Sequence, residues 1–363
     1  MANHMTVLPP SSSTASVSAA SSSAASASAA SASIAPASDA TLKRAATLLR
    51  AGELVAFPTE TVYGLGADAG NPAAVAKIFA AKGRPADHPV IVHVAAAKDF
   101  AFWAHDIPEV AQKLIARFCP GPLTLILPRA THVSDTITGG QDSIGIRMPS
   151  HPVARRLLQA FAAQGGRGIA APSANCFGHV SPTTAQHVAD DLQDRVALIV
   201  DGGSCEHGIE STIIALTGDA PLLLRPGSLP LAALEATLGA PLQRLDRTHA
   251  SAAPRASGTL ASHYAPRTSA ELVAAEALTV VSRRYQQEGK RVAALLRTVP
   301  ALEHATHTFV APINVSGYAH ALYAALRALD AHGDDVLLIE DVPASIEWLA
   351  VHDRLLRATT KTN

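Results

Sequence analysis

Four basic residues have the type and placement expected of an anion-binding site. Lys82 and Arg84 flank Gly83 between an expected helix and an expected buried strand, Arg147 lies in the segment IGIRM, and Arg225 lies in LRPG. Positioned lysine and arginine side chains can neutralise phosphate or carboxylate charge without a phosphate-binding glycine loop. Each residue also fits an ordinary role, as a lysine in the last helical turn or as an exposed arginine. The four cations are therefore candidates for phosphate binding, with these ordinary roles as the alternative.

Small polar residues follow the short apolar segment GIAA, within residues 172–182. Ser173, Asn175 and Ser181 could donate hydrogen bonds to phosphate or ribose, because a sheet edge often presents such loops to ligands. The alternative is a turn that caps a helix starting near Thr183. Ser173 is not part of a GxSxG motif, which disfavours a serine hydrolase.

Several other functional classes lack their signals. GLGADAG at 64–70 is GxGxxxG, separated by six residues from the strand that a dinucleotide fold requires, and there is no GxxxxGK[ST] motif. The histidines and cysteines match no metal-site spacing. A formal charge of −1 gives no basic excess for nucleic acid. The three cysteines show no CxxC spacing, which favours a reducing cytoplasm. The sequence contains no apolar run of 18 residues, so no membrane-spanning helix is expected.

The pattern of apolar segments predicts an α/β protein with a mixed sheet. Expected strands alternate with helical stretches such as 152–163, and the segment TIIALTGDAPLLLR at 212–225 reads as an antiparallel hairpin. The segment PTETVYGLGADAG is loop-like. The expected strands are 54–57, 90–94, 123–127, 144–148, 168–171 and 196–200.

Composition divides the chain into four parts. Residues 1–38, rich in Ser and Ala, read as a disordered tail, 39–240 as the first domain, and 241–268 as a linker. Residues 269–363 read as a smaller α/β domain. Its expected elements are strands 278–282, 291–296 and 335–339 and helices 317–331 and 344–357.

Seven segments in one order carry a family resemblance. They are PTETVYGLGAD, KGRPADHPVIVHV, IGIRMP, APSAN, SPT, GIESTI and LRPG. Together they resemble the threonylcarbamoyl-AMP synthase family, whose catalytic domain is YrdC-like. HYAP at 263–266 and the segments YAHALYAALRALD and AVHDRL resemble its longer, two-domain form. The resemblance implies a twisted, open, mixed sheet with a large concave cleft, followed by a smaller Rossmann-like domain.

The resemblance also implies a reaction and a set of site residues. L-threonine, bicarbonate and ATP, the last with Mg²⁺, would give threonylcarbamoyl-AMP and pyrophosphate, and the product would pass to the downstream transfer machinery and tRNA. Catalytic charge stabilisation would come from Lys82, Arg84 and Arg147. The threonine contacts would be Thr61, His93, Arg147, Ala171 and Ser211. The ATP contacts would be Lys82, Arg84, His88, Ser143, Ser173, Asn175, Ser181, Arg225 and Tyr264.

Two points follow from the resemblance at individual positions. Tyr264 lies in the linker, so an ATP contact there would make the linker a lid over the active site. Phe177 and His88 depart from the common pattern, since smaller residues often follow the Ser-x-Asn motif and Asn is often found where His88 stands.

Two other functions compete with the synthase. A noncatalytic RNA-binding module of YrdC-like fold would use the same concave surface, although the neutral charge and the small-molecule motifs disfavour it. A carbamoyl-transfer enzyme of hydrogenase maturation contains a similar domain in a larger chain. This sequence lacks the zinc-finger cysteines and the acylphosphatase-like segment expected there.

Overall fold

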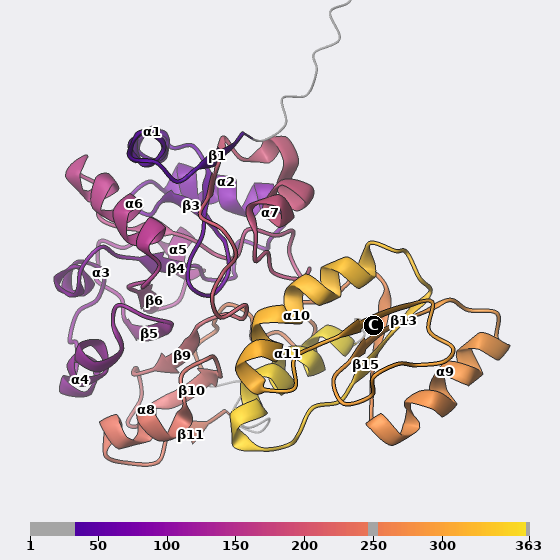
Figure 1. Ribbon diagram of the computed structural model, residues 1–363. Coiled ribbons are helices and arrows are strands. Elements are labelled where there is room, and N and C mark those ends of the chain that lie inside the picture. The colour runs from indigo at the N-terminus through magenta and orange to yellow at the C-terminus, as the bar shows by residue number, and fades with distance from the viewer. Residues whose placement is uncertain (1–32, 246–252, 361–363) are drawn as a thin grey trace, which may run out of the picture. The chain divides into compact units, whose positions relative to one another are not determined.

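The computed structural model describes residues 33–245 and 253–360, which belong to one compact unit. These residues form an eleven-stranded mixed sheet and a separate four-stranded parallel sheet (Figure 1). The first sheet and its helices make up the first domain, and the second sheet and its helices make up the second domain. The predicted fold class, an open mixed sheet followed by a smaller α/β domain, is confirmed.

The large sheet places its central strands beside one another although they are distant in sequence. β4 runs parallel to β6, and β6 runs antiparallel to β5, which in turn runs parallel to β9. In sheet order the strands are β1 Ile34–Pro36, β8 Leu198–Asp201, β2 Val55–Phe57, β3 Gly64–Asp68, β7 Ile169–Ala170, β4 Ile91–His93, β6 Ser143–Arg147, β5 Leu123–Pro128, β9 Thr212–Ala215, β10 Leu222–Arg225 and β11 Gln243–Arg244.

The helices of the first domain pack on this sheet through their buried apolar faces. They are α1 Asp39–Arg50, α2 Pro72–Lys82, α3 Phe100–Trp103, α4 Glu109–Phe118, α5 Asp135–Thr138, α6 Pro152–Ala163, α7 Ala185–Leu192 and α8 Leu231–Leu238. In α2, the Asn71 side chain accepts from the N–H groups of Ala73 and Ala74. Gly83 ends this helix in the left-handed conformation, with φ 63°. These two signals fix Lys82 in the last turn.

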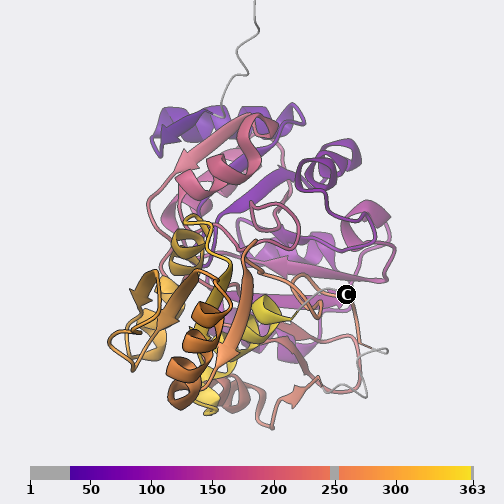
Figure 2. The same ribbon diagram turned by 90° about the vertical axis from the view of Figure 1, so that its right-hand side faces the viewer.

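The second domain has helices on both faces of its sheet (Figure 2). Its strands, in sheet order, are β12 Ser269–Val273, β15 Val336–Glu340, β13 Val292–Leu296 and β14 His307–Val310, and its helices are α9 Leu278–Gln287, α10 Val315–Asp330 and α11 Leu349–Thr359. Ala293 and Leu295 pack with α10 and α11, whereas the alternate residues Val292 and Ala294 pack with α9. This alternation follows from the two-residue period of a strand.

Two sequence predictions about local structure are wrong. Residues 278–282 form the start of α9 rather than a strand, because Leu278, Val281 and Tyr285 recur at helical spacing and pack on one side of the second sheet. The expected loop at 64–68 is the buried strand β3. Gly66 permits this packing, since a Cβ there would lie 2.9 Å from Phe57 Cε1 and Ile169 Cγ2.

The ends of the predicted segments also differ from the structure. Residues 34–36 of the expected tail form β1, which pairs in parallel with β8. Strands β12 and β14 were not predicted, and β11 lies inside the expected linker. The rest of the tail, residues 1–32, and residues 246–252 of the linker lie outside the described residues. The predicted hairpin at 212–225 is confirmed as the antiparallel pair β9 and β10.

Candidate active site

Strands β4, β6 and β5 place three polar side chains in a row across the large sheet. His93 pairs with Arg147 in register, and Arg147 pairs with Thr124. Residues paired across neighbouring strands share one face of a sheet, and all three are buried. We call His93, Arg147 and Thr124 the polar row. A ligand on this face would meet a ring nitrogen, a guanidinium and a hydroxyl group side by side.

Arg147 is held in the polar row by a buried carboxylate. Its Nη2 donates to Glu60 Oε1 at 2.6 Å, and Glu60 Oε2 accepts from the backbone N–H groups of Ser150 and His151 at 3.2 and 3.4 Å. Burial acts to raise the pKa of Glu60, but the charge and hydrogen bond of Arg147 outweigh it and lower that pKa. The ion pair therefore stays charged and fixes the orientation of the guanidinium.

Two nitrogen atoms of the polar row have no hydrogen-bond partner in the described structure. They are Nδ1 of His93 and Nε of Arg147. Burial, reinforced by the Arg147 charge, lowers the pKa of His93 to about 3, so its imidazole is neutral. Unpaired buried polar atoms cost free energy, and a ligand with both donor and acceptor groups could satisfy these two.

Arg225 connects the end of β10 to the polar row. Its Nε donates to the carbonyl oxygen of Ser211 at 3.0 Å, and its Nη2 donates to Ser211 Oγ at 3.2 Å. Ser211 Oγ in turn lies 2.8 Å from Thr124 Oγ1. One chain of hydrogen bonds therefore links a predicted ATP residue, a predicted threonine residue and the polar row.

The linker covers this face of the sheet and bridges two arginines. Ala256 packs on Ile91 of β4 and its apolar neighbours. Ser257 Oγ accepts from Arg84 Nη2 at 3.3 Å, and the Ser257 carbonyl accepts from Arg225 Nη1 at 2.7 Å. Ser143 lines a cavity of about 10 Å³ beneath this segment, space for roughly one water. The linker thus contacts Arg84 and Arg225, two of the four basic residues that the sequence offers as phosphate-binding candidates.

A buried carboxylate, Glu210, joins the first domain to the second. Ser181 Oγ donates to Glu210 Oε1 at 2.6 Å, while Tyr323 of α10 and Arg354 of α11 both donate to Oε2 at 2.8 Å. Burial acts to raise the pKa of Glu210, but Arg354 and Arg225 lower it to about 2. The carboxylate is therefore ionised, and side chains from the second domain hold it in place.

Tyr264 packs beside this carboxylate at the end of the linker. Its ring lies 5.8 Å from that of Tyr323 in a stacked arrangement and 5.3 Å from the Arg354 guanidinium carbon. Tyr264 adopts φ 61°, a left-handed conformation that non-glycine residues rarely adopt. Its hydroxyl donates to the carbonyl of Gly258 at 3.4 Å. The HYAP segment is thus folded onto both domains.

Lys82 has two protein partners. Its Nζ donates to the carbonyl oxygens of Ser173, at 2.6 Å, and Asn175. Burial, together with the charge of Arg84, lowers the pKa of Lys82 to about 7. The Asn175 amide nitrogen donates to two further carbonyls of its loop, while its Oδ1 has no partner in the described structure. Lys82 therefore shapes the predicted phosphate loop, and its own phosphate contact stays a prediction.

The remaining predicted residues lie around these groups. His88 packs its ring against Phe177 at 5.3 Å, and the Arg84 guanidinium carbon lies 5.5 Å from the same ring. Thr61 Oγ1 lies 2.9 Å from Thr59 Oγ1. Ala171 is buried, and its N–H donates to the carbonyl of Ile91. Phe177 thus forms an apolar surface between two of the predicted ATP residues.

Two carboxylates and one hydroxyl that orient the site were not predicted from the sequence. Glu60 and Glu210 are charged residues inside the segments PTETVYGL and GIESTI, whose other residues carry no charge. Thr124 is the single polar residue of LTLIL. A charged or polar residue among apolar ones is a usable signal, because such groups are buried only with partners. The partners in the second domain, Tyr323 and Arg354, give no comparable signal.

Neither a cluster of metal-binding side chains nor a membrane-spanning helix occurs in the described ranges, 33–245 and 253–360. No group of three or more His, Cys, Asp or Glu side chains there is arranged to hold a metal ion. None of the helices in these ranges has both the length and the apolar character needed to cross a membrane.

Comparison with known proteins gives matches over most of the chain. A family model described as "Telomere recombination" matches residues 47–227, and one described as "Threonylcarbamoyl-AMP synthase, C-terminal domain" matches 229–360. The threonylcarbamoyl-AMP synthase of Pyrococcus abyssi is 42% identical over 332 residues, which cover 88% of this chain and 94% of the relative. That of Bacillus subtilis is 40% identical over 326 residues, with coverages of 88% and 93%.

A solved structure agrees with these matches. The crystal structure of P. abyssi Sua5 complexed with L-threonine is similar with a TM-score of 0.83 and 40% identity. The similarity covers 90% of this chain and 97% of that one. It therefore extends over both domains.

Proposed function

Because this chain belongs to the threonylcarbamoyl-AMP synthase family, we propose that the polar row and the linker above it form its active site. There L-threonine, bicarbonate and ATP would react to give threonylcarbamoyl-AMP and pyrophosphate. One observation carries this assignment. Eleven buried side-chain N or O atoms of the described residues have no hydrogen-bond partner, and four of them belong to Arg84, His93, Arg147 and Asn175. These are predicted substrate contacts, so bound substrates would supply the missing partners.

The reaction requires that two anions meet. Addition of the threonine amine to bicarbonate, with loss of water, gives a carbamate. A carbamate oxygen then forms a bond to the α-phosphorus of ATP, the bond to the bridging oxygen breaks, and pyrophosphate leaves with the electron pair. The reacting atoms must approach to about 3–3.5 Å. Positive charge placed at the site before the reaction lowers the cost of this approach.

The cations of the site divide into two groups. Arg147, oriented by Glu60, can pair with the carboxylate or carbamate of threonine, while neutral His93 adds a hydrogen bond without adding charge. Arg84 and Arg225 both contact Ser257 of the linker and can hold phosphate oxygens. We therefore assign the polar row to threonine and the arginines beneath the linker to ATP.

The two carboxylates of the site bear on where Mg²⁺ would bind. Glu60 is paired with Arg147, and Glu210 accepts from Arg354, Tyr323 and Ser181. Neither carboxylate is therefore free to act as a metal ligand. Mg²⁺ is commonly bound through substrate phosphate oxygens and water. We propose that Mg²⁺ enters with ATP and is held mainly by the triphosphate. There it would neutralise the phosphate charge that the arginines do not neutralise.

The linker is the part of the site that must move. Ser257 accepts hydrogen bonds from Arg84 Nη2 and Arg225 Nη1, so phosphate can contact these two nitrogen atoms only if the segment around Ser257 shifts or exchanges its hydrogen bonds for phosphate contacts. We propose that the linker opens to admit ATP and closes over it. After release, threonylcarbamoyl-AMP would pass to the transfer machinery and tRNA in the cytoplasm.

The experiment that tests this function measures pyrophosphate release from ATP by the purified full chain. Release is expected to require both L-threonine and bicarbonate, because the carbamate is the nucleophile. An equal rate without threonine would overturn the proposal. Arg147→Ala should raise the KM for threonine more than the KM for ATP, and the reverse order would overturn the assignment of the two groups of cations.

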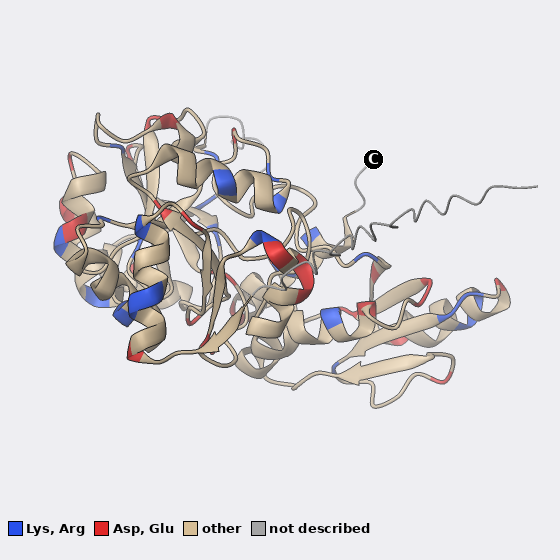
Figure 3. Ribbon diagram, turned by 90° about the horizontal axis from the view of Figure 1, so that it is seen from above, with Lys and Arg blue, Asp and Glu red and all other residues tan. Residues whose placement is uncertain are grey.

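A noncatalytic RNA-binding module is the second candidate, and the charge distribution disfavours it. Basic and acidic residues are mixed over the ribbon in Figure 3, and the formal net charge is −1. Binding to RNA by phosphate neutralisation needs an excess of basic residues and weakens steeply with salt. Tight, salt-sensitive RNA binding without ATP turnover would favour this candidate over the synthase.

A further inference from the structure

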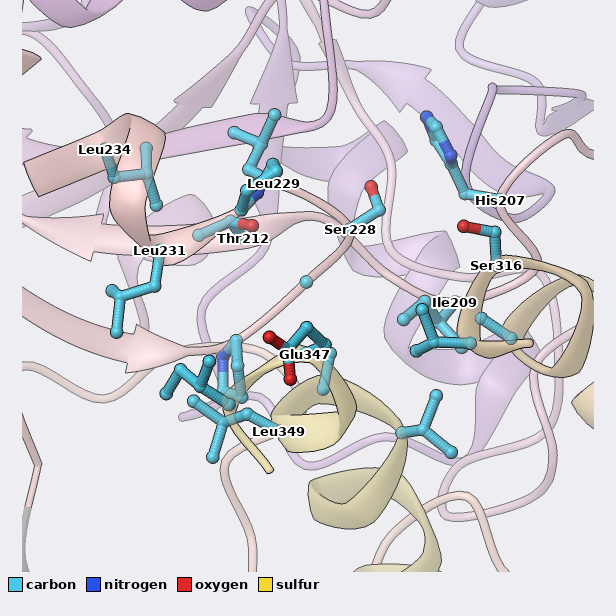
Figure 4. A pocket seen from close by; sticks show the side chains of 18 of the residues that line it. His207, Ile209, Thr212, Ser228, Leu229, Leu231, Leu234, Ser316, Glu347 and Leu349 are labelled. Atoms are coloured by element: carbon cyan, nitrogen blue, oxygen red, sulfur yellow. The ribbon is translucent and has the colours of Figure 1, made fainter. Parts of the chain in front are cut away.

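A second cavity lies between the two domains, on the other side of the large sheet from the polar row. Its volume is about 580 Å³, within the range of small-molecule sites. The first domain contributes residues around Thr212 and Leu231, and the second contributes the first turn of α10 and residues 346–351 (Figure 4). Ile213 of β9 pairs with Thr124 and so shares the face of the polar row, whereas the side chain of the preceding residue, Thr212, points to the opposite face. The cavity is therefore distinct from the proposed active site.

The cavity contains two hydroxyl groups that lack hydrogen-bond partners. Thr212 is 1% exposed, and neither its Oγ1 nor the buried Oγ of Ser228 has a partner in the described structure. Both residues line the cavity, and Figure 4 shows them on its first-domain side. The proposed reaction uses neither. A buried hydroxyl without a partner costs free energy, so these two groups point to a ligand with a polar atom.

The charged residues of the cavity are all acidic. Glu206 and Glu347 are among the lining residues, which include neither Lys nor Arg. Burial lowers the pKa of His207, which favours its neutral form. Figure 4 shows the Glu347 carboxylate on the second-domain side, across from Ser228. This arrangement favours a cationic ligand and disfavours an anion, which would lie near two carboxylates without a compensating charge.

The rest of the wall is aliphatic and comes from both domains. Leu229, Leu231 and Leu234 form one side, and Ile346 and Leu349 face them from the second domain. Such a wall would bind a bulky apolar group through the hydrophobic effect. We propose that this cavity binds a small primary amine with an apolar body, its ammonium beside Glu347 and a polar atom of its body at Thr212 and Ser228.

Occupancy of this cavity would act on the proposed active site through neighbouring residues. Ile209 and Thr212, which line the cavity, flank Glu210 and Ser211 in sequence, and Pro226 follows Arg225. An amine that fixes these segments changes the free energy of closing the site around ATP. This coupling rests on the proposed function, whereas the binding of an amine does not.

The test is calorimetric titration of the full chain, without substrates, with three molecules of similar shape. Tryptamine carries an ammonium, tryptophol is its neutral alcohol, and indole-3-propionate is an anion. Their indole N–H can donate to a hydroxyl oxygen. Tryptamine should bind roughly fivefold more tightly than tryptophol, the size of a partly exposed charge pair, and the anion more weakly still. Absence of tryptamine binding, or binding of the anion as tight as that of tryptamine, would overturn the proposal.

Two pairs of variants locate the binding. Ser316→Trp places a large ring at the cavity wall from an exposed position of α10, and its control Ala328→Trp places the same ring on the same helix away from the cavity. Glu347→Gln removes an exposed charge, with Glu276→Gln as its control. We expect Ser316→Trp to abolish binding and Glu347→Gln to reduce tryptamine affinity to that of tryptophol. Unchanged affinity in both would refute the site.

The coupling has its own measurement. Saturating tryptamine should change the Kd for ATP at least about threefold, and this change should vanish in Ser316→Trp. An unchanged Kd would refute the coupling. If the chain bound tryptamine but released no pyrophosphate in the presence of all three substrates, the proposed function would fail while the amine site stood.

Discussion

Replacement of Arg354 by Met should destabilise the protein. Arg354 is fully buried, and its Nε donates to Glu210 Oε2 at 2.8 Å. Met keeps much of the apolar volume but removes the charge, so a buried carboxylate loses its main counter-ion. Breaking one partner of a buried ion pair typically costs about 3–5 kcal/mol.

The structure places this variant near the lower end of that range. Glu210 keeps hydrogen bonds from Ser181 and Tyr323 and the charge of Arg225, which together stabilise its ionised form in part. We therefore expect a loss of about 3 kcal/mol in the free energy of unfolding at pH 7. Urea denaturation followed by circular dichroism measures this loss as a fall in the midpoint concentration.

The double variant separates the ion pair from packing. Glu210→Gln should itself destabilise the protein, but combined with Arg354→Met it should cost at least about 1 kcal/mol less than the sum of the single variants, because neither charge is then left unpaired. Arg283→Met replaces an exposed arginine of the same domain and should change stability by no more than about 0.5 kcal/mol. A loss below about 1 kcal/mol for Arg354→Met, or additive single losses, would refute this reasoning.

Three further predictions concern the same groups. The pKa of Glu210 is lowered from its ordinary value of 4.5 to about 2, so the contribution of Glu210 to stability is fully present above pH 4.5 and is lost as the pH falls toward 2. The free energy of unfolding, measured as the pH is lowered over this interval, should therefore fall less in Glu210→Gln than in the wild type. Gly258→Ala should raise the KM for ATP at least about tenfold, because a Cβ there would lie 1.9 Å from the Tyr264 hydroxyl and the φ of Gly258 is 76°. An unchanged KM for ATP would argue against the placement of the linker. Arg147→Lys keeps the charge but loses the planar guanidinium. In steady-state assays kcat/KM for threonine should therefore fall at least about tenfold, while the Kd for ATP stays within about twofold. Equal losses for both substrates would contradict the assigned role of Arg147.

The fold class could be predicted because the strands and helices of the first domain have clear patterns of apolar residues in the sequence. The strands around VIVHV, LTLIL and IGIRM are short apolar runs bounded by turn residues, and all three are present as β4, β5 and β6. Local patterns failed where packing decides the conformation. GLGAD reads as a loop because of its glycines, yet Gly66 is what allows β3 to lie between Phe57 and Ile169.

The candidate site was only partly accessible from sequence. Motifs identified residues such as Arg84 and Arg225, but their common contact with Ser257 depends on how the linker lies across the sheet. The contacts of Glu210 with Tyr323 and Arg354 join positions more than 110 residues apart, and neither local spacing nor propensity encodes such a pairing. Lys82 shows the converse: a motif suggested a phosphate ligand, and the structure gives its Nζ two carbonyl partners.

We propose that the polar row and the covering linker make an adenylate of N-carboxylated threonine. Mass spectrometry of the products formed from ATP, L-threonine and ¹³C-labelled bicarbonate is the direct test. We expect threonylcarbamoyl-AMP that carries one ¹³C atom, formed together with pyrophosphate and lost in Arg147→Ala. Formation of ADP and phosphate, or of an adenylate without the labelled carbon, would contradict the claim.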